Sequence, residues 1–286
     1  MKIEYGVWHE IGCRGVQEDR HIVLADTKNE WIVCAILDGH GGSEVVDYVA
    51  QNLGAILFKY LGECEDAERR LIRKRIRTCF RRFDQEMYLA GLNGGCTFSG
   101  IVHNTKRNRT FLVNLGDSKT FIKTRTHSTI TVDHKPSAPK EIARISKAGG
   151  QSVVKSGRVL GIAMSRAFGD FRAKRRICSL SYTSCHGFIS SAPSVREFTS
   201  AGSDMVALLA SDGFWDCISS EHCTAVLEDL LLETSERKSH EKVVLQLSPA
   251  MEELACNLAL AAIGASSQDN VSVLVVRFML TSSTQV

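Results

Sequence analysis

The sequence of 286 residues is short of proline and of long apolar runs. It has four prolines and no stretch rich in proline or in glycine and serine, so we expect a single domain over residues 1–286. No apolar run approaches the roughly 20 residues that cross a membrane, and the N-terminus lacks the apolar core of a signal peptide. Lys2 excludes N-myristoylation, which needs glycine at that position. We therefore expect a soluble protein with no membrane partner, in the cytoplasm by default and with the nucleus as the alternative.

The sequence also lacks a strong net charge and closely paired cysteines. A net charge of +3 gives no indication of nucleic-acid binding, so we expect no nucleic-acid partner. The ten cysteines are scattered singly, with no Cys-x-x-Cys pair. Cys34, Cys79 and Cys256 lie within apolar patterns, whereas Cys178 and Cys185 lie in a polar segment. We expect reduced thiols, most of them buried.

Strand-like and helix-like patterns occur in separate clusters along the chain. Residues 21–24 and 31–37 predict a hairpin, and a helix follows in which apolar residues from Val46 to Tyr60 recur every three or four positions. Such clustering indicates an α+β fold rather than repeated βαβ units. Further strands are expected at 97–103, 110–115, 119–124, 128–132, 158–161, 194–198, 205–210 and 271–279. Further helices are expected at 65–90, 139–148, 220–234 and 249–262.

The predicted helix at 65–90 has an unusual density of arginine between Arg69 and Arg82. Its apolar stripe includes Ile76 and Phe80, which would face the core, so the basic residues would face outward. Two interpretations are open. The run is either a solvated basic face, as most charge runs are, or a docking surface for an acidic partner or substrate tail.

Four aspartates stand at the ends of apolar strand runs, far apart in the sequence. They are Asp38, Asp117, Asp212 and Asp269. A buried carboxylate at a strand tip is costly without a positive partner, and four gathered carboxylates would repel one another. Because hard divalent cations prefer oxygen ligands, we expect the four to converge on such cations. The pattern therefore indicates metal-assisted hydrolysis.

The strongest local motif begins at Asp38, which is followed by Gly39, His40 and two more glycines. The glycines allow a tight turn, and Gly39 has no side chain to shield its carbonyl oxygen from a metal. His40 would lie beside the metal and could donate a proton to a leaving group. Taken alone, the motif could equally be a turn with a surface histidine.

A second motif covers residues 14–20. Arg14 could hold two oxygens of a phosphate group in a fork. Glu18 and Asp19 could hold metal-bound waters or orient an arginine. A charged loop with local salt bridges is the alternative for this segment alone.

Eight short motifs follow one another along the chain. In order they are Arg14 with Glu18-Asp19, Asp38-Gly39-His40-Gly41-Gly42, Gly95-Cys96-Thr97, Leu115-Gly116-Asp117-Ser118, Asp133-His134-Lys135-Pro136, the segment 161–170, Ser211-Asp212-Gly213-Phe214-Trp215-Asp216 and Asp269-Asn270. In this order they resemble the metal-dependent serine/threonine protein phosphatases of type 2C, the PPM family. The resemblance covers about residues 5–278, and the ordered set is far more specific than any single motif.

The resemblance implies a fold and a set of metal ligands. The family fold is an α-β-β-α sandwich, in which two stacked antiparallel β-sheets are flanked by α-helices and a two-metal site lies at one edge. The ions are Mg²⁺ or Mn²⁺. By resemblance, Asp38 bridges the two ions, the carbonyl of Gly39 serves one, Asp212 with Asp269 serves the other, Glu18 and Asp19 act through water, and Asp117 with Asp212 can hold a third, weaker ion.

The resemblance also implies a reaction. A water activated by the two ions attacks the phosphorus of a phosphoserine or phosphothreonine ester on a protein substrate, with no phospho-enzyme. Arg14 is the phosphate-binding residue, and with His40, which protonates the departing alkoxide, it forms the catalytic pair. We expect a monomer. The segment 171–191 differs most from the family pattern, and we expect it to form a mobile flap that governs substrate choice.

Three rival interpretations were weighed. A cysteine-based phosphatase would need a Cys-x5-Arg loop, and the one match, from Cys64 to Arg70, has three acidic residues inside it that would repel phosphate. A zinc hydrolase lacks its histidine spacing. A catalytically silent relative that acts as a binding scaffold is the serious alternative, but every expected metal aspartate and Arg14 are present, which favours an active enzyme.

Overall fold

The computed structural model describes residues 1–28, 30–62, 68–150, 154–155, 157–175, 187–200, 202–232 and 243–279. The larger of its two main sheets is built from strands at both ends of the chain. These are β1 (Lys2–Glu10), β8 (Lys119–Lys123), β9 (Ser128–Ile130), β14 (Met205–Ala210), β15 (Val244–Leu247) and β16 (Val271–Met279). Their order is β15-β1-β16-β14-β8-β9, and every pairing is antiparallel except that of β1 with β15.

The second main sheet is fully antiparallel and has the order β13-β7-β6-β3-β2. Its strands are β2 (Arg20–Asp26), β3 (Trp31–Leu37), β6 (Phe98–Asn104), β7 (Arg109–Leu115) and β13 (Ser194–Phe198). Two-residue strands form two minor sheets: β4 (Gly39–His40), β5 (Gly95–Cys96) and β12 (Phe168–Gly169) in one, and β10 (Val154–Lys155) and β11 (Arg158–Val159) in the other.

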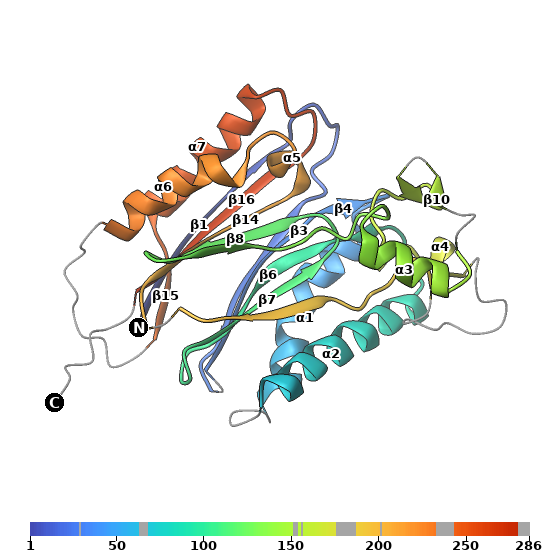
Figure 1. Ribbon diagram of the computed structural model, residues 1–286, viewed down its shortest axis with the longest axis horizontal. Helices are drawn as coiled ribbons and strands as arrows, with labels where there is room; N and C mark the ends of the chain where they lie inside the picture. The colour runs from blue at the N-terminus through green and yellow to red at the C-terminus, as the bar shows by residue number, and fades with distance from the viewer. Residues whose placement is uncertain are drawn as a thin grey trace.

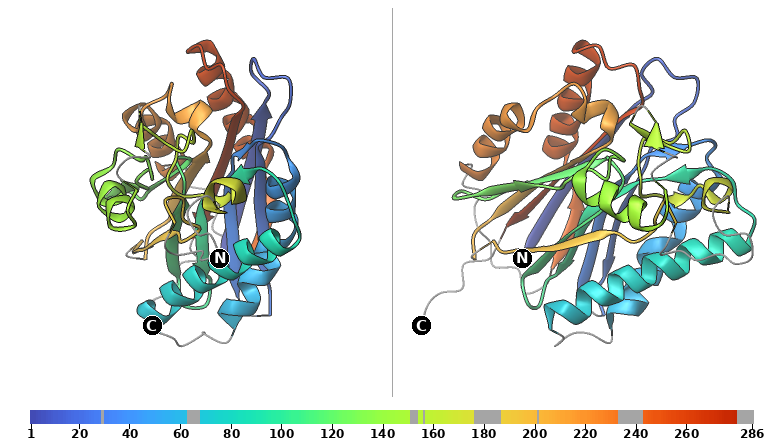
Figure 2. Two further views of the ribbon diagram at one scale, coloured as in Figure 1. Left: turned by 90° about the vertical axis from the view of Figure 1, so that its right-hand side faces the viewer. Right: turned by 45° about the vertical axis from the view of Figure 1, so that its right-hand side comes forward.

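Helices cover the outer faces of both main sheets. On the five-stranded sheet they are α1 (Glu44–Gly62) and α2 (Arg69–Leu89), and on the six-stranded sheet α5 (Asp212–Trp215), α6 (Ser220–Leu232) and α7 (Pro249–Gly264). Two further helices, α3 (Pro139–Lys147) and α4 (Phe171–Arg175), pack in a separate small cluster. In Figure 1, α6 and α7 lie above the six-stranded sheet and α1 and α2 lie below the five-stranded one. Both turned views in Figure 2 keep this arrangement. The predicted α+β fold of two stacked antiparallel sheets flanked by helices is confirmed.

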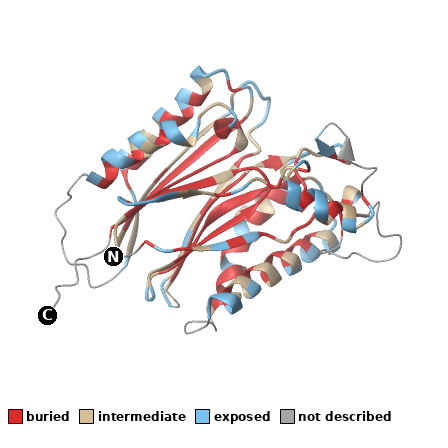
Figure 3. Cartoon of the chain, in the orientation of Figure 1, coloured by how far each residue is buried: buried red, intermediate tan, exposed pale blue. Residues whose placement is uncertain are grey.

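Alternation of side chains along each central strand supplies two cores at once. In β3, Trp31, Val33, Ala35 and Leu37 pack toward α1 and α2, whereas the intervening residues Ile32, Cys34 and Ile36 pack between the sheets. β16 divides its side chains in the same way between α7 and the inter-sheet layer. Successive strand residues point to opposite faces, so a strand buried on both faces is a continuous apolar run. Figure 3 shows the resulting buried strands beneath helices with exposed outer faces.

The structure corrects several expected element bounds. β1 and β15 were not predicted, and the predicted strand at 128–132 ends at Ile130. Val132 lies outside the sheet because its carbonyl accepts a hydrogen bond from the side chain of Asn114. Its side chain is accordingly 74% exposed. The predicted helix at 65–90 begins at Arg69, and residues 63–67 lie outside the described residues.

The cysteines largely meet expectation. Among the seven described cysteines none forms a disulfide, and Cys34, Cys79, Cys96 and Cys223 are buried. Cys64, Cys178 and Cys185 lie outside the described residues. No helix in the described part of the chain is both long and apolar enough to cross a membrane.

Candidate active site

Strand register brings the first group of candidate residues together. Arg20, at the start of β2, lies opposite Leu37, at the end of β3. Glu18 and Asp19 therefore enter the sheet where Asp38 leaves it. Asn270 fastens the loop before β2 in place, since its side chain accepts the amide of Glu18 at 2.9 Å. This end of the five-stranded sheet thus carries three carboxylates.

The six-stranded sheet ends at the same place. Ala210, the last residue of β14, lies opposite both Lys119 of β8 and Val273 of β16. Asp212 follows β14 and Asp269 precedes β16, so the two carboxylates share one end of the sheet. Asp117 lies in the turn from β7 to β8, which crosses from one sheet to the other.

The pKa of Asp38 reflects the proximity of these carboxylates. Burial, followed by the charges of Asp212, Asp19, Asp117 and Asp269, raises the pKa of Asp38 well above its usual value. Burial is also the main cause that raises the pKa of Asp19 to about 7 and that of Asp212 to about 6. The carboxylates therefore oppose one another's ionisation, a cost that a bound cation would remove. We refer to these five aspartates as the acidic cluster.

Two basic side chains already contact the acidic cluster. Arg14 Nη2 donates to Asp269 Oδ2 at 2.6 Å, and Lys135 Nζ donates to Asp117 Oδ2 at 2.5 Å. Asp19 Oδ2 and Asp117 Oδ1 are buried and have no hydrogen-bond partner in the described part of the chain. Within the residues that the structure describes, no three His, Cys, Asp or Glu side chains are placed to hold a metal ion as they stand. Asp269 and Asp117 would have to turn from Arg14 and Lys135 toward a shared cation.

Gly39 is required by the close packing of the turn after Asp38. A Cβ at this position would lie 2.5 Å from the carbonyl oxygen of Glu18 and 2.8 Å from Val46 Cγ1. The glycine run also presents a donor, because the amide of Gly42 donates to Glu18 Oε1 at 2.8 Å. The turn therefore holds Glu18 and the Gly39 backbone beside Asp38.

His40 is held by Asp170, the last residue of the motif at 161–170, to which no role was assigned from the sequence. Its Nε2 lies 3.0 Å from both carboxylate oxygens of Asp170. Burial disfavours the imidazolium, but the hydrogen bond and charge of Asp170 outweigh burial and raise the pKa of His40. Gly95 makes room for the pair, since a Cβ there would lie 2.5 Å from His40 Nε2. A protonated His40 beside the acidic cluster is a suitable proton donor.

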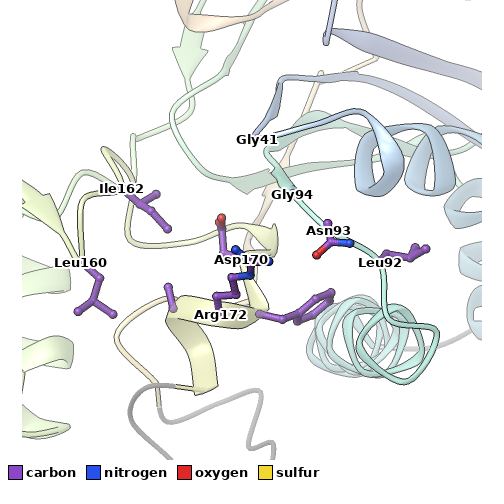
Figure 4. Close-up of a pocket in the computed structure, with 10 residues that line it drawn as sticks. Gly41, Leu92, Asn93, Gly94, Leu160, Ile162, Asp170 and Arg172 are labelled. Carbon is purple, nitrogen blue, oxygen red and sulfur yellow. The ribbon is translucent and has the colours of Figure 1, made fainter.

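A cleft of about 690 Å³ opens beside the His40–Asp170 pair (Figure 4). Leu160 and Ile162 line it from the loop before Asp170, and Leu92 and Asn93 line it from the segment after α2. Asp170 belongs both to this wall and to the contact with His40. Residues 171–175 of the expected flap form α4 at the edge of the cleft, and residues 176–186 lie outside the described residues.

Two functional contacts were missed because they depend on the fold. Lys135 and Asp117 are 18 residues apart, and His40 and Asp170 are 130 residues apart. Thr97 and Ser118 were also missed, although their hydroxyls meet at 2.7 Å and Thr97 accepts the amide of Asp38 at 3.1 Å. The only available signal was that all of these residues belong to the ordered motifs.

Comparison with known proteins gives a consistent picture. The family model described as "Protein phosphatase 2C" matches residues 3–271. Protein phosphatase 2C 53 of Oryza sativa subsp. japonica is 30% identical over 275 residues, which cover 85% of this chain and 58% of that protein. The human integrin-linked kinase-associated serine/threonine phosphatase 2C is 30% identical over 297 residues, with 93% of this chain and 70% of that protein covered. The chain thus spans little more than half of the rice relative.

Solved structures support the same fold. A C. elegans sex determining protein superimposes with a TM-score of 0.74 at 23% identity, covering 97% of this chain and 65% of that one. A phosphatase from a pathogenic strain of Toxoplasma gondii superimposes with a TM-score of 0.72 at 21% identity, covering 96% of this chain and 92% of that one. At this identity the likeness concerns the fold alone.

Proposed function

Because the chain belongs to the protein phosphatase 2C family, we propose that it hydrolyses phosphoserine and phosphothreonine esters of proteins. The observation that carries the proposal is the acidic cluster around Asp38, which lies beside the His40–Asp170 pair and a cleft. Such a cluster suits a reaction in which cations bind and activate the reacting groups. We further propose that residues 1–286 form a single catalytic domain that acts as a monomer in the cytoplasm.

The chemistry of the acidic cluster fits Mg²⁺ or Mn²⁺. All of its donors are oxygens, as these hard ions prefer, and two of its buried carboxylate oxygens have no hydrogen-bond partner among the residues that the structure describes. When bound, two such ions supply an activated water for attack on phosphorus. The proposed ligands are Asp38, the carbonyl of Gly39, Asp212 and Asp269, with Glu18 and Asp19 acting through water and Asp117 helping to hold a third, weaker ion.

The other steps belong to side chains of the chain itself. Arg14 is exposed, and in the proposal its guanidinium exchanges Asp269 for the phosphate oxygens and stabilises their charge. His40 Nε2 contacts Asp170, whereas Nδ1 is buried and has no hydrogen-bond partner among the described residues. In the proposal Nδ1 is the nitrogen that would donate to the leaving oxygen. Protonation of that oxygen by His40 would complete the cleavage.

The decisive experiment measures phosphate release from a phosphothreonine peptide with Mn²⁺, with Mg²⁺ and with EDTA. We expect release that requires either metal and that falls at least ~100-fold in Asp212→Asn, since that variant removes a charged ligand. Asp229→Asn, an exposed carboxylate on α6, is the matched control and should behave as the wild type. No release from folded protein with any metal would favour the silent scaffold instead.

The role of His40 is tested by leaving groups of different basicity. His40→Ala should slow hydrolysis of an alkyl phosphate by ~100-fold or more and that of an aryl phosphate much less, because a phenolate leaves with little proton assistance. Both rates are measured at saturating metal. Equal losses on the two substrates would remove His40 as the proton donor.

A further inference from the structure

The basic run on α2 is not neutralised by the helix that carries it. Between Arg69 and Arg82 the helix has no acidic residue, and its first turn has none either. The next acidic residue, Asp84, is fully buried, and its carboxylate is already paired with Lys174. The helix itself therefore supplies no carboxylate to pair with these arginines.

Arg77 lies where α2 packs against the start of β13, and Arg73 is four residues before it on the same helix. Arg77 Nε donates to the carbonyl of Pro193 at 3.3 Å, and Arg166 Nη1 donates to the neighbouring carbonyl of Ala192 at 2.9 Å. The guanidinium groups of Arg77 and Arg166 thus reach adjacent peptide groups of one segment. Burial, followed by the charges of Arg73, Arg166 and Arg81, lowers the pKa of Arg77, so these cations repel one another.

The neighbouring charges are balanced unequally. Arg166 is compensated by Glu141, which accepts its Nε at 3.0 Å. Among the residues that the structure describes, neither Arg73 nor Arg77 forms an ion pair, and Arg73 Nε is a buried donor with no hydrogen-bond acceptor. A buried donor without an acceptor is costly, and an anionic ligand would remove that cost.

The position of these arginines relates them to the candidate active site. Arg77 and Arg166 donate to adjacent carbonyls, and Arg166 is four residues before Asp170, the partner of His40. Arg77 is twelve residues before the end of α2, roughly 18 Å along the helix, so the two arginines lie at a distance from the part of the cleft that Leu92 and Asn93 line. Two arginines four positions apart on a helix are separated by roughly 6 Å, about the span of two residues of an extended chain. This spacing suits a short run of carboxylates. A nucleic acid would require a broader basic surface than one helix face of a protein with a net charge of +3.

We propose that Arg73 and Arg77 form a docking site for an acidic segment of the phosphoprotein substrate, separate from the site of phosphate hydrolysis. This inference rests on the proposed phosphatase function. Binding would place carboxylates against two guanidinium groups that form no ion pair with the residues that the structure describes. Substrates with an acidic run outside the phosphorylated residue would then be preferred.

The test uses the double variant Arg73→Gln/Arg77→Gln and a matched control, Lys28→Gln/Lys59→Gln, which removes the same charge from exposed positions away from β13. A fluorescent, unphosphorylated glutamate-rich octapeptide is titrated without metal, so that binding is measured independently of turnover. We expect the Arg73/Arg77 variant to weaken its Kd about tenfold, the control to leave it unchanged, and added salt to weaken wild-type binding.

Kinetics on two phosphopeptides then connect the site to the substrate. With an acidic extension, kcat/KM should fall about tenfold in the Arg73/Arg77 variant through KM, and without the extension it should not change. Wild-type binding no tighter than that of a glutamine octapeptide, equal losses in the control, or equal kcat/KM for the two phosphopeptides would each overturn the docking site. Intact octapeptide binding in a protein that releases no phosphate would count against the phosphatase function alone.

Discussion

Asp38→Ala should abolish phosphate release, with a loss of at least ~1000-fold in kcat/KM, while the protein remains folded. Burial and the charges of all four other members of the acidic cluster raise the pKa of Asp38, and in the proposal its carboxylate is a ligand of both cations. Removal of this ligand should therefore disturb both proposed ions at once. The measurement is phosphate release at saturating Mn²⁺, with circular dichroism to establish folding. A variant that keeps most of its activity would show that Asp38 does not bridge the ions.

Substitution of Asp38 should lower activity but raise the stability of the metal-free protein. Because the folded state raises the pKa of Asp38, ionisation of this group at neutral pH costs folding free energy. Asp38→Asn removes the charge, so its melting temperature in EDTA should exceed that of the wild type. Addition of Mn²⁺ should then stabilise the wild type more than the variant. A lower melting temperature in EDTA would mean that the carboxylate is structurally required.

Asp84→Ala should destabilise the protein by ~3–5 kcal/mol, the cost of leaving one member of a buried ion pair alone. Asp84 accepts Lys174 Nζ at 2.8 Å and the amide of Gly169 at 2.9 Å, and its side chain is fully buried. Lys174 lies in α4, directly after the Gly169–Asp170 turn that meets His40. Urea unfolding monitored by fluorescence gives the change in free energy.

A double variant separates the ion pair from simple packing. Asp84→Leu/Lys174→Met removes both charges and should recover part of the stability, since a buried pair contributes little net free energy relative to apolar residues. The amide of Gly169 and the carbonyl of Ala167 lose their partners in this variant, so recovery should be incomplete. Asp229→Ala, on the exposed side of α6, should cost less than ~0.5 kcal/mol. A loss below ~1 kcal/mol in Asp84→Ala would mean that water or another group satisfies Lys174.

Strands buried on both faces were predictable to the residue. The strands at 31–37, 205–210 and 271–279 were expected with the bounds that the structure has. Each is an apolar run bounded by polar or turn residues, so the local pattern contains the information. β1 was missed although Ile3, Tyr5 and Val7 alternate with other residues and face the layer between the sheets. Its main partner, β16, lies near the C-terminal end of the sequence, so no neighbouring segment indicates the pairing. The two-residue strands around His40 have no local signal at all, because tertiary contacts alone form them.

The candidate site also has features that could be predicted from local sequence and features that could not. The aspartates at strand ends could be recognised from sequence because the signal, an acidic residue directly beside an apolar run, is local. The partners of these groups could not. Arg14 was expected to bind a phosphate group, and in the structure its guanidinium donates a hydrogen bond to Asp269. Lys135 was assigned no role, although its ammonium group donates to Asp117. Such pairs are chosen by register and loop packing, which are properties of the assembled sheets.

The pairing of β1 with β16 has a consequence for how the protein is made. Lys2 lies opposite Met279, and the sheet that carries Asp212 cannot be completed until β16 is present. During synthesis the first strand must wait for the last, while the β2–β3 hairpin and α1 can already form near the ribosome. Asp269 joins the acidic cluster only with that final strand. A chain that lacks β16 would therefore carry most of the cluster but not the assembled site, and we expect the proposed phosphatase activity to require β16.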